Sequence, residues 1–469
     1  MNTSSFPPRT VRDLPAPPAK LWRIVGPGIV AAGVGLSSGE FVLWPFIASQ
    51  VGLVFLWGAV AGAGTQLFLN MEIERYTLAT GETAITGFNR IWKHWGLVLA
   101  VMVYFANLWP GWALSSATLV TFLFGGGDPA LIAVGGLLII GAALTLAPVV
   151  YVALERLIFV KVLGVAILAA LAVAFAISAD AWAALPPAVV AGAGRFPTEL
   201  GFALLFGAIA FAGAGGGQNL CQSNYIRDKG FGMGQYLPRL VSPLTGVEEA
   251  APARVSYTFE TTPANMDRWR RWWRFANIEQ TATFFAMTVV TIVLTSLLSY
   301  SVLYGEPGLP NSVQFLRVEG EKLSALVAPW FGALFWFIGA FSLFGSAMGI
   351  IDYTSRLAAD VLKSTYLPNS SVTESRLYFG LVWGLVAIGC VVLLSGMAQP
   401  LVLLIISATV GGGMMCIYAG LLIVTNKRLL PEPIRVRSYR LGMLVFATVV
   451  FGALAVLTAW QQITNLLRS

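Results

Sequence analysis

Two glycine-rich stretches in this sequence interrupt apolar segments and carry polar side chains. Residues 33–40 read GVGLSSGE, and residues 213–219 read GAGGGQN. Each glycine disfavours a helix by about 1 kcal/mol relative to alanine, so a helix is expected to break at both places. The oxygens and amides at such breaks are suited to binding a cation or an organic solute. A second interpretation is that the glycines only allow helices to pack closely.

Glu40 is the acidic side chain of the first stretch, and its surroundings are apolar. A charge inside a membrane is costly unless it is paired or hydrated. Glu40 is therefore a candidate cation ligand, proton acceptor or counter-charge to a substrate, and its structural alternatives are an ion pair or a helix cap. Arg356 is one candidate partner. However, Asp352, Arg356 and Asp360 have i, i+4, i+8 spacing and are expected to pair along their own helix.

Other polar side chains have simpler explanations. Glu155, Arg156 and Lys161 begin an apolar segment and are expected to form a snorkelling or gating ion pair. The single histidine, His94, argues against a histidine-based metal site. A G-x-x-x-x-G-K-[ST] phosphate loop is not found in the sequence, and no histidine is placed to act as a general base, so the chain is not expected to be an enzyme.

The composition is that of a membrane protein with many spans. Of 469 residues, 57% are hydrophobic and 11% are charged, whereas soluble domains have about 25% charged residues. This balance excludes a soluble enzyme, a disordered chain and a disulfide-rich scaffold. The three cysteines, Cys221, Cys390 and Cys416, lie in apolar stretches and are expected to be buried hydrophobic residues.

Eleven stretches are long and apolar enough to cross a membrane, which takes about 20 residues. We therefore expect a cytoplasmic tail over residues 1–23 and a single transmembrane domain over residues 24–465. The predicted spans are 24–47, 52–73, 95–124, 129–149, 155–178, 198–221, 275–303, 327–360, 375–396, 399–424 and 440–464.

The distribution of Lys and Arg predicts the orientation. With a cytoplasmic N-terminus, the outer segments hold only Arg195, Arg317, Lys322 and Arg468. The positive-inside rule therefore predicts a cytoplasmic N-terminus, an external C-terminus and an odd number of spans. The polar, proline-rich N-terminus does not resemble a cleavable signal peptide. The expected location is the bacterial inner (plasma) membrane.

The longest polar segment, residues 223–272, is the predicted cytoplasmic loop between the sixth and seventh spans. Residues 268–274 at its end read RWRRWWR. Basic residues interspersed with tryptophans are typical of a helix at the cytoplasmic lipid surface. The lipid bilayer is therefore the expected partner of this segment, and nucleic acid is not.

From about residue 24 to 465, the sequence resembles the Nramp family of proton-coupled divalent metal transporters. Residues 37–40 (SSGE) stand where the family carries Asp-Pro-Gly-Asn, and residues 216–220 (GGQNL) where it carries Met-Pro-His-Asn-Leu. Residues 26–28 (GPG), 345–348 (GSAM) and 425–427 (TNK) also resemble the family. The resemblance implies an all-α, LeuT-type fold. This fold has two inverted repeats of five helices, with broken first and sixth helices, and here one additional helix.

The sequence departs from the family at the residues that handle the metal. The family's Asp, Asn and Met ligands correspond to Ser37, Glu40 and Gly216, and its proton-moving His corresponds to Gln218. Without the thioether, the site loses its preference for soft transition metals, and Glu40 is left to supply the compensating charge. A larger site with oxygen ligands alone suits a hard, magnesium-like ion that keeps part of its water.

We therefore predict a secondary transporter that works by alternating access on a hard divalent metal cation, without a cofactor. Proton and sodium are the candidate coupling ions. The alternatives are a transporter of a small organic solute such as an amino acid, and a non-transporting sensor or scaffold. Glu40, Gln218 and Asn219 are the candidate metal ligands, and Glu40, Asp352 and Arg356 are the candidate coupling or gating residues. The predicted substrate site comprises Ser37, Ser38, Gly39, Glu40, Gly216, Gly217, Gln218 and Asn219.

Overall fold

The computed structural model describes residues 6–18, 26–147, 150–237, 255–397 and 399–468. The elements before residue 238 are, in order, β1 (Thr10–Val11), α1 (Pro27–Gly35), η2 (Ser38–Leu43), α2 (Trp44–Val51), η3 (Gly52–Phe55), α3 (Leu56–Thr80), α4 (Ala84–Ile91), α5 (Trp95–Asn107), α6 (Gly111–Phe124), α7 (Pro129–Leu146), α8 (Val150–Phe175), α9 (Ala179–Gly192), η4 (Thr198–Leu200), α10 (Phe202–Ala210), α11 (Gly217–Lys229) and η5 (Gly232–Tyr236).

The elements after residue 254 are, in order, β2 (Tyr257–Thr258), α12 (Pro263–Glu279), η6 (Gln280–Ala286), α13 (Met287–Leu303), α14 (Phe315–Leu326), α15 (Pro329–Val361), η7 (Leu362–Tyr366), α16 (Glu374–Leu394), α17 (Pro400–Arg428), η8 (Glu432–Ile434) and α18 (Ser438–Arg468). The two strands form a single short parallel pair, so the predicted all-α fold class is confirmed.

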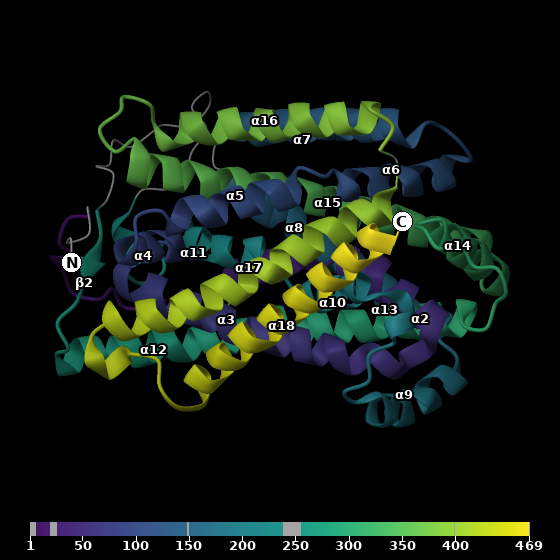
Figure 1. Cartoon of the computed structure of the whole chain (residues 1–469), viewed down its shortest axis with the longest axis horizontal. Helices are drawn as coiled ribbons and strands as arrows, with labels where there is room; N and C mark the ends of the chain where they lie inside the picture. The colour runs from purple at the N-terminus through teal and green to yellow at the C-terminus, as the bar shows by residue number, and fades with distance from the viewer. Residues whose placement is uncertain (1–5, 19–25, 148–149, 238–254, 398, 469) are drawn as a thin grey trace.

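Most of the long helices run along the longest axis of the molecule (Figure 1). β2 and α4 lie at one end of this axis, which we call the tail end, and α9 and α14 lie at the other, which we call the α14 end. α18 finishes toward the α14 end, whereas β1, near the start of the chain, pairs with β2 at the tail end. This arrangement is consistent with an odd number of crossings.

In the described part of the chain, nine stretches are long and apolar enough to cross a membrane. One of them, Gly28–Thr80, covers two predicted spans, because only the turn at Gly52 and η3 separates α2 from α3. The predicted sixth span is the pair α10 and α11, each too short to cross by itself. Each of the eleven predicted spans therefore coincides with helices of the structure.

The first and sixth spans are both broken, as predicted. α1 ends at Gly35 and the chain resumes as η2 at Ser38, while α10 ends at Ala210 and α11 begins at Gly217. The two breaks lie in backbone contact. A Cβ atom on Gly35 would lie 1.7 Å from the carbonyl oxygen of Gly213, and one on Gly39 would lie 2.4 Å from that of Phe211. The glycines therefore fit both interpretations. They end the helices, and they also allow the backbones of the two breaks to pack in contact.

The described N-terminal segment is part of the folded tail end. Arg268 donates to the carbonyl oxygen of Leu14 at 2.9 Å, and the indole of Trp272 donates to that of Pro15 at 2.8 Å. Trp269 and Trp272 are buried, while Arg270 and Arg271 are exposed beside Asp267. We expected this whole basic segment at the lipid surface. Instead, these two tryptophans pack inside the protein, Trp269 against Phe259 and Trp272 against Phe231 and the N-terminal segment.

Replacing Gly35 with alanine is expected to destabilise the protein, because the new Cβ would overlap the carbonyl group of Gly213. Overpacking a buried site costs about 1–3 kcal/mol or more, and backbone cannot move aside as a side chain does. The measurement is the thermal-unfolding midpoint in detergent. Gly135→Ala in α7 is the matched control, because a Cβ there would have nothing within 4 Å. Equal midpoints for the two variants would contradict the backbone contact.

Candidate functional site

Three side chains hold the break in the first helix. Oε2 of Glu40 accepts a hydrogen bond from the backbone amide of Ser37 at 3.0 Å. Ser342 on α15 donates to the carbonyl oxygen of Leu36 at 2.7 Å, and Ser346, one turn later, donates to that of Val34. These bonds satisfy backbone groups that a continuous helix would have paired, as a low-dielectric interior requires.

The break in the sixth helix is held by an equivalent set from α3. Gln66 donates to the carbonyl oxygens of residues 209, 210 and 212 at 3.3, 2.9 and 3.0 Å, and it accepts from the amide of Ala214 at 2.9 Å. Asn219 accepts from the amide of Gly216 at 2.8 Å and donates to Asn70 on α3 at 2.7 Å. Gln66 and Asn70 are one helical turn apart, as Ser342 and Ser346 are.

Glu40 and Asn219 therefore do the same job at corresponding places. Each lies three residues after the residue whose amide it accepts, at the start of the half-helix that follows a break. A carboxylate there also interacts favourably with the positive end of the helix dipole. The structural alternative for Glu40, a helix cap, is thus present. It uses one oxygen, and Oε1, fully buried, has no hydrogen-bond partner among the described residues.

The predicted site residues differ in how free they are to bind a ligand. Both polar atoms of Gln218 are buried without a partner in the described structure, and so is the hydroxyl of Ser37. The side chain of Asn219 is already engaged at both ends. No group of three or more His, Cys, Asp and Glu side chains that could hold a metal ion is found among the described residues. The free ligand groups at the breaks are therefore both donors and acceptors of hydrogen bonds.

Lys161 lies where the sequence did not predict it. The sequence predicts a snorkelling or gating ion pair among Glu155, Arg156 and Lys161, but Glu155 forms its ion pair with Lys229 instead. Lys161 is fully buried and donates to the hydroxyl of Ser346 at 2.5 Å. It also interacts electrostatically with Glu40, although the two side chains form no direct ion pair in the described structure. Its position within the apolar run 157–175 was the signal that could have placed it in the interior.

The second predicted coupling cluster forms a separate buried network. Arg356 binds Asp352 at 3.0 Å, as its spacing predicted, and also binds Asp228 of α11 at 2.5 Å. The hydroxyls of Tyr378 and Tyr225 donate to Asp352 at 2.7 and 3.0 Å. Arg356 is therefore engaged away from Glu40. Asp360, the third member of the predicted run, instead accepts from Thr83 at 2.7 Å and lies 3.7 Å from Arg227.

No protein-family profile matches the chain, and no curated protein matches its sequence. The similarity is structural. A crystal structure of a mutant Eremococcus coleocola manganese transporter superposes with a TM-score of 0.68 at 12% identity, covering 99% of this chain and 92% of that one. The fold is Nramp-like. MhsT in complex with L-phenylalanine gives a TM-score of 0.55 at 10% identity, covering 92% of this chain and 97% of that one.

Mhp1, a nucleobase-cation-symport-1 family transporter in a closed conformation with bromovinylhydantoin bound, gives a TM-score of 0.54 at 11% identity. That match covers 99% of this chain and 96% of the other. The predicted LeuT-type architecture is thus confirmed over nearly the whole length of the chain, and the matched structures carry transporter rather than enzyme names.

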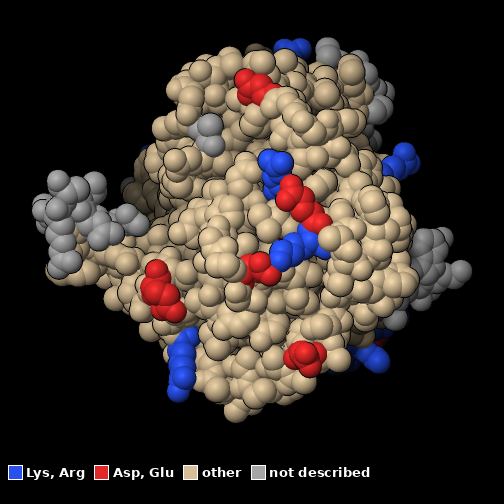
Figure 2. Space-filling model, turned by 90° about the vertical axis from the view of Figure 1, so that its right-hand side faces the viewer, with Lys and Arg blue, Asp and Glu red and all other residues tan. Residues whose placement is uncertain are grey.

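This LeuT-type structure is hollow at the α14 end. A cavity of about 950 Å³ opens there between α6, α10, α14 and α17. Phe46 of α2 and Leu204 of α10 contribute to its lining, so the cavity contacts the half-helices that adjoin the two breaks, but none of the predicted site residues lines it. Figure 2 views this end, where adjacent basic and acidic side chains gather on a mostly uncharged surface. Ion pairs of this end include Arg317–Glu321 and Lys322–Glu306.

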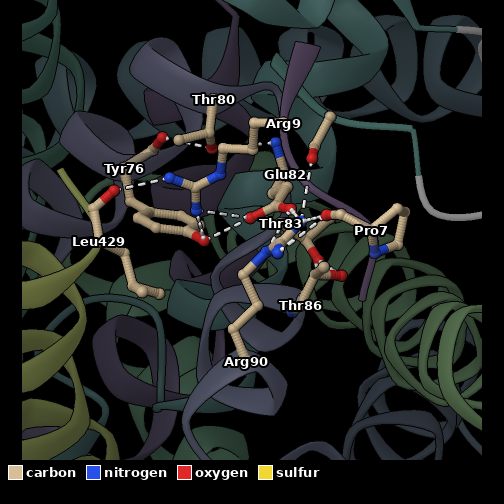
Figure 3. A network of polar contacts seen from close by, with 10 residues as sticks. Pro7, Arg9, Tyr76, Thr80, Glu82, Thr83, Thr86, Arg90 and Leu429 are labelled. Carbon is tan, nitrogen blue, oxygen red and sulfur yellow. Dashed lines mark hydrogen bonds and ion pairs between the residues drawn. The ribbon is translucent and has the colours of Figure 1, made fainter. Parts of the chain in front are cut away.

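At the tail end, a charged network ties the N-terminal segment to three helices (Figure 3). Glu82, between α3 and α4, accepts from Arg9 at 2.9 Å, from Arg90 at 2.7 Å and from the hydroxyl of Tyr76. Arg9 also donates to the carbonyl oxygen of Leu429 after α17 at 2.6 Å. Burial alone would raise the pKa of Glu82, but the charges of Arg9 and Arg90 hold it below its ordinary value.

Replacing Gln66 with methionine is expected to lower the unfolding midpoint, because several backbone groups of the sixth-helix break would lose their partner. A buried group left unsatisfied costs about 1–3 kcal/mol. Gln218→Met is the matched control, since that amide is equally buried but has no partner to lose within the described structure. A larger loss of stability in Gln218→Met than in Gln66→Met would contradict these assignments.

Acidification is expected to weaken the tail-end network through Glu82. Because its pKa in the folded protein is below the ordinary value of 4.5, its contribution to stability is complete above about that pH and is lost as the pH falls through the folded pKa. Glu82→Gln should lower the free energy of unfolding by on the order of 3 kcal/mol at neutral pH. It should also weaken the fall of the unfolding midpoint as the pH is lowered. Glu432→Gln, in an exposed pair with Arg437, is the control. An unchanged fall of the midpoint in Glu82→Gln would refute the role of Glu82.

Proposed function

We propose that the protein is a secondary transporter that carries a small solute by alternating access, with its binding site at the two helix breaks. The observation that carries this proposal is the set of fully buried polar atoms at the breaks that have no partner in the described structure. A cavity that opens at the α14 end is lined in part by the half-helices that adjoin these breaks. Unpaired polar groups are costly in a membrane interior, so their presence favours a ligand or water that completes them. The transporters that share the fold support the proposal.

The two ends of the molecule fit one state of such a cycle. The α14 end is hollow, and the tail end is joined by Arg9, Glu82 and Arg90. With the predicted orientation, the α14 end faces outward and the tail end faces the cytoplasm. The structure then corresponds to a state that receives its cargo from outside. Transport requires the tail-end network to separate while the cavity closes.

The charge at the breaks favours an organic cargo over a divalent ion. Glu40 is the carboxylate of the predicted site, and the positive charge of Lys161 acts on it from α8. A hard divalent cation is usually bound by one or two carboxylates, and here Lys161 offsets the charge of the single carboxylate. The free groups also include a donor that a metal ion cannot use, the amide nitrogen of Gln218, whereas the hydroxyl oxygen of Ser37 suits either cargo.

We therefore favour a small organic solute as the cargo, either a zwitterion such as an amino acid or an uncharged molecule. Oε1 of Glu40 would meet a cationic or donor group of the solute, and Gln218 would bind its polar remainder. The hard divalent cation is the second candidate. It is supported by the free oxygens of Glu40 and Gln218 and by the fold shared with a manganese transporter.

Isothermal titration of the purified protein with amino acids, magnesium and manganese tests this proposal. We expect saturable heat with an organic solute, and at least tenfold weaker binding in Glu40→Gln, about the effect of one hydrogen bond to a charged group. Ser38→Ala is the control, because it leaves the carboxylate in place.

Saturable binding of a metal alone, abolished in Glu40→Gln, would reverse the choice of cargo. Equal effects of Glu40→Gln and Ser38→Ala on any ligand would reduce Glu40 to its capping role. The absence of binding to a broad panel, together with no uptake into proteoliposomes, would refute the transport proposal and favour a non-transporting sensor or scaffold.

A further inference from the structure

Lys161 is a buried basic side chain that is not among the proposed cargo ligands. Its side chain is 1% exposed, and its ammonium group donates to Ser346 on α15 at 2.5 Å. Among the described residues it forms no direct ion pair, although Glu40 acts on it electrostatically. An ammonium group with so little compensation inside a membrane protein is costly, which makes it a candidate for function.

The backbone around Lys161 is shaped to admit it. A Cβ on Gly33 of α1 would lie 2.2 Å from Ile158 of α8, so this glycine lets the two helices approach. A Cβ on Gly345 of α15 would lie 3.3 Å from Cδ of Lys161, so the second glycine leaves room for the side chain. The lysine therefore lies in a slot between three helices rather than reaching toward the surface.

The hydrogen bonds of Lys161 lead to the end of the first half-helix. Ser346 accepts from Lys161 and donates to the carbonyl oxygen of Val34, in the last turn of α1. Carbonyl groups at a helix C-terminus carry about half a negative charge. In transporters with discontinuous helices, such C-terminal ends coordinate the coupling cation. Here the ammonium group of Lys161 occupies the corresponding position and contacts the helix end through the hydroxyl of Ser346.

The helices packed around Lys161 leave it with Glu40 as its charged neighbour. α1 and α13 contain no Asp, Glu, Lys or Arg. On α15, Asp352 and Arg356 bind each other and further partners, and Asp360 lies beyond them toward the tail end. On α8 itself, Glu155 pairs with Lys229, and Arg156 is five residues from Lys161.

We propose that Lys161 is the proton-binding group that couples transport, taking the place of a bound metal cation at the C-terminal end of α1. This inference rests on the proposed transport function. With its proton bound, the ammonium group and Ser346 hold the last turn of α1 against α15. When the proton leaves to water, a neutral amine remains, the hold weakens and the first helix is free to move. Coupling then depends on protons and not on sodium.

The test measures the width of the cavity by double electron–electron resonance between two spin labels. This measurement needs no cargo. Spin labels are placed at Gly126→Cys and Gln314→Cys, two positions that line the cavity, in a protein without its native cysteines. Distances are recorded from pH 5 to pH 9 in sodium chloride and in potassium chloride. The lysine variants are Lys161→Arg, which stays charged, and Lys161→Met, which has no charge. Lys322→Met, in a pair exposed to solvent, is the control.

We expect the ratio of open to closed cavities in the parent protein and in Lys322→Met to change by about tenfold over this pH range, equally in both salts. Lys161→Arg should remain at the low-pH ratio and Lys161→Met at the high-pH ratio. A pH response that persists in Lys161→Met, or a ratio that follows sodium, would overturn the assignment of Lys161.

The same experiment separates the two proposals. If pH moves the distances but the variants respond like the parent, alternating access stands and only the role of Lys161 fails. If the distances stay constant at every pH and also with each solute and metal of the binding panel, the transport proposal fails and the inference fails with it. Lys161→Arg, which keeps the charge and its hydrogen bond, guards against a folding defect in Lys161→Met.

Discussion

The need to satisfy backbone polar groups away from water governs this structure. A continuous helix does this within itself, but the first and sixth spans are interrupted and leave amides and carbonyls exposed to a low-dielectric interior. Neighbouring helices supply the missing partners. α3 serves the sixth-helix break through Gln66 and Asn70, and α15 serves the first-helix break through Ser342 and Ser346. The breaks are thus stabilised by side chains of neighbouring helices, and α3 and α15 must lie beside them to supply these hydrogen bonds.

Side-chain caps complete the same task at the half-helices that follow the breaks. Glu40 and Asn219 bind equivalent amides, although one is charged and the other is neutral. The charge of Glu40 is therefore more than the cap requires. Lys161 acts on Glu40 electrostatically, although the two side chains form no direct ion pair among the described residues. Other buried charges of this region, such as Asp352 and Arg356, are fully paired. Glu40 and Lys161 are thus two buried titratable groups that no direct ion pair joins among the described residues, unlike Asp352 and Arg356.

The sequence predicted the parts of this arrangement that depend on local pattern. Apolar length placed the eleven spans, glycine clusters placed both breaks, and i, i+4 spacing paired Asp352 with Arg356. It could not predict partners from distant segments. Gln66 lies 143 residues from the first carbonyl that it binds, and Lys161 lies 185 residues from Ser346. The burial of Trp272 could not be predicted for the same reason, because Phe231 and the N-terminal segment that it contacts are remote in sequence. The ligand-binding role of the predicted site residues stays a prediction.

The tail-end network has a consequence for how the protein is made. Arg9 and its acceptor at Leu429 are 420 residues apart. The strand Thr10–Val11 can pair only after Tyr257–Thr258 has been synthesised. At about 5–20 residues per second, a ribosome would need about 20–80 s to reach the second partner after the first has emerged. The early helices must therefore enter the membrane before the hydrogen bonds of the tail end have formed. Closure of the tail end is among the last steps of biosynthesis, and a nascent chain released early would keep that end open.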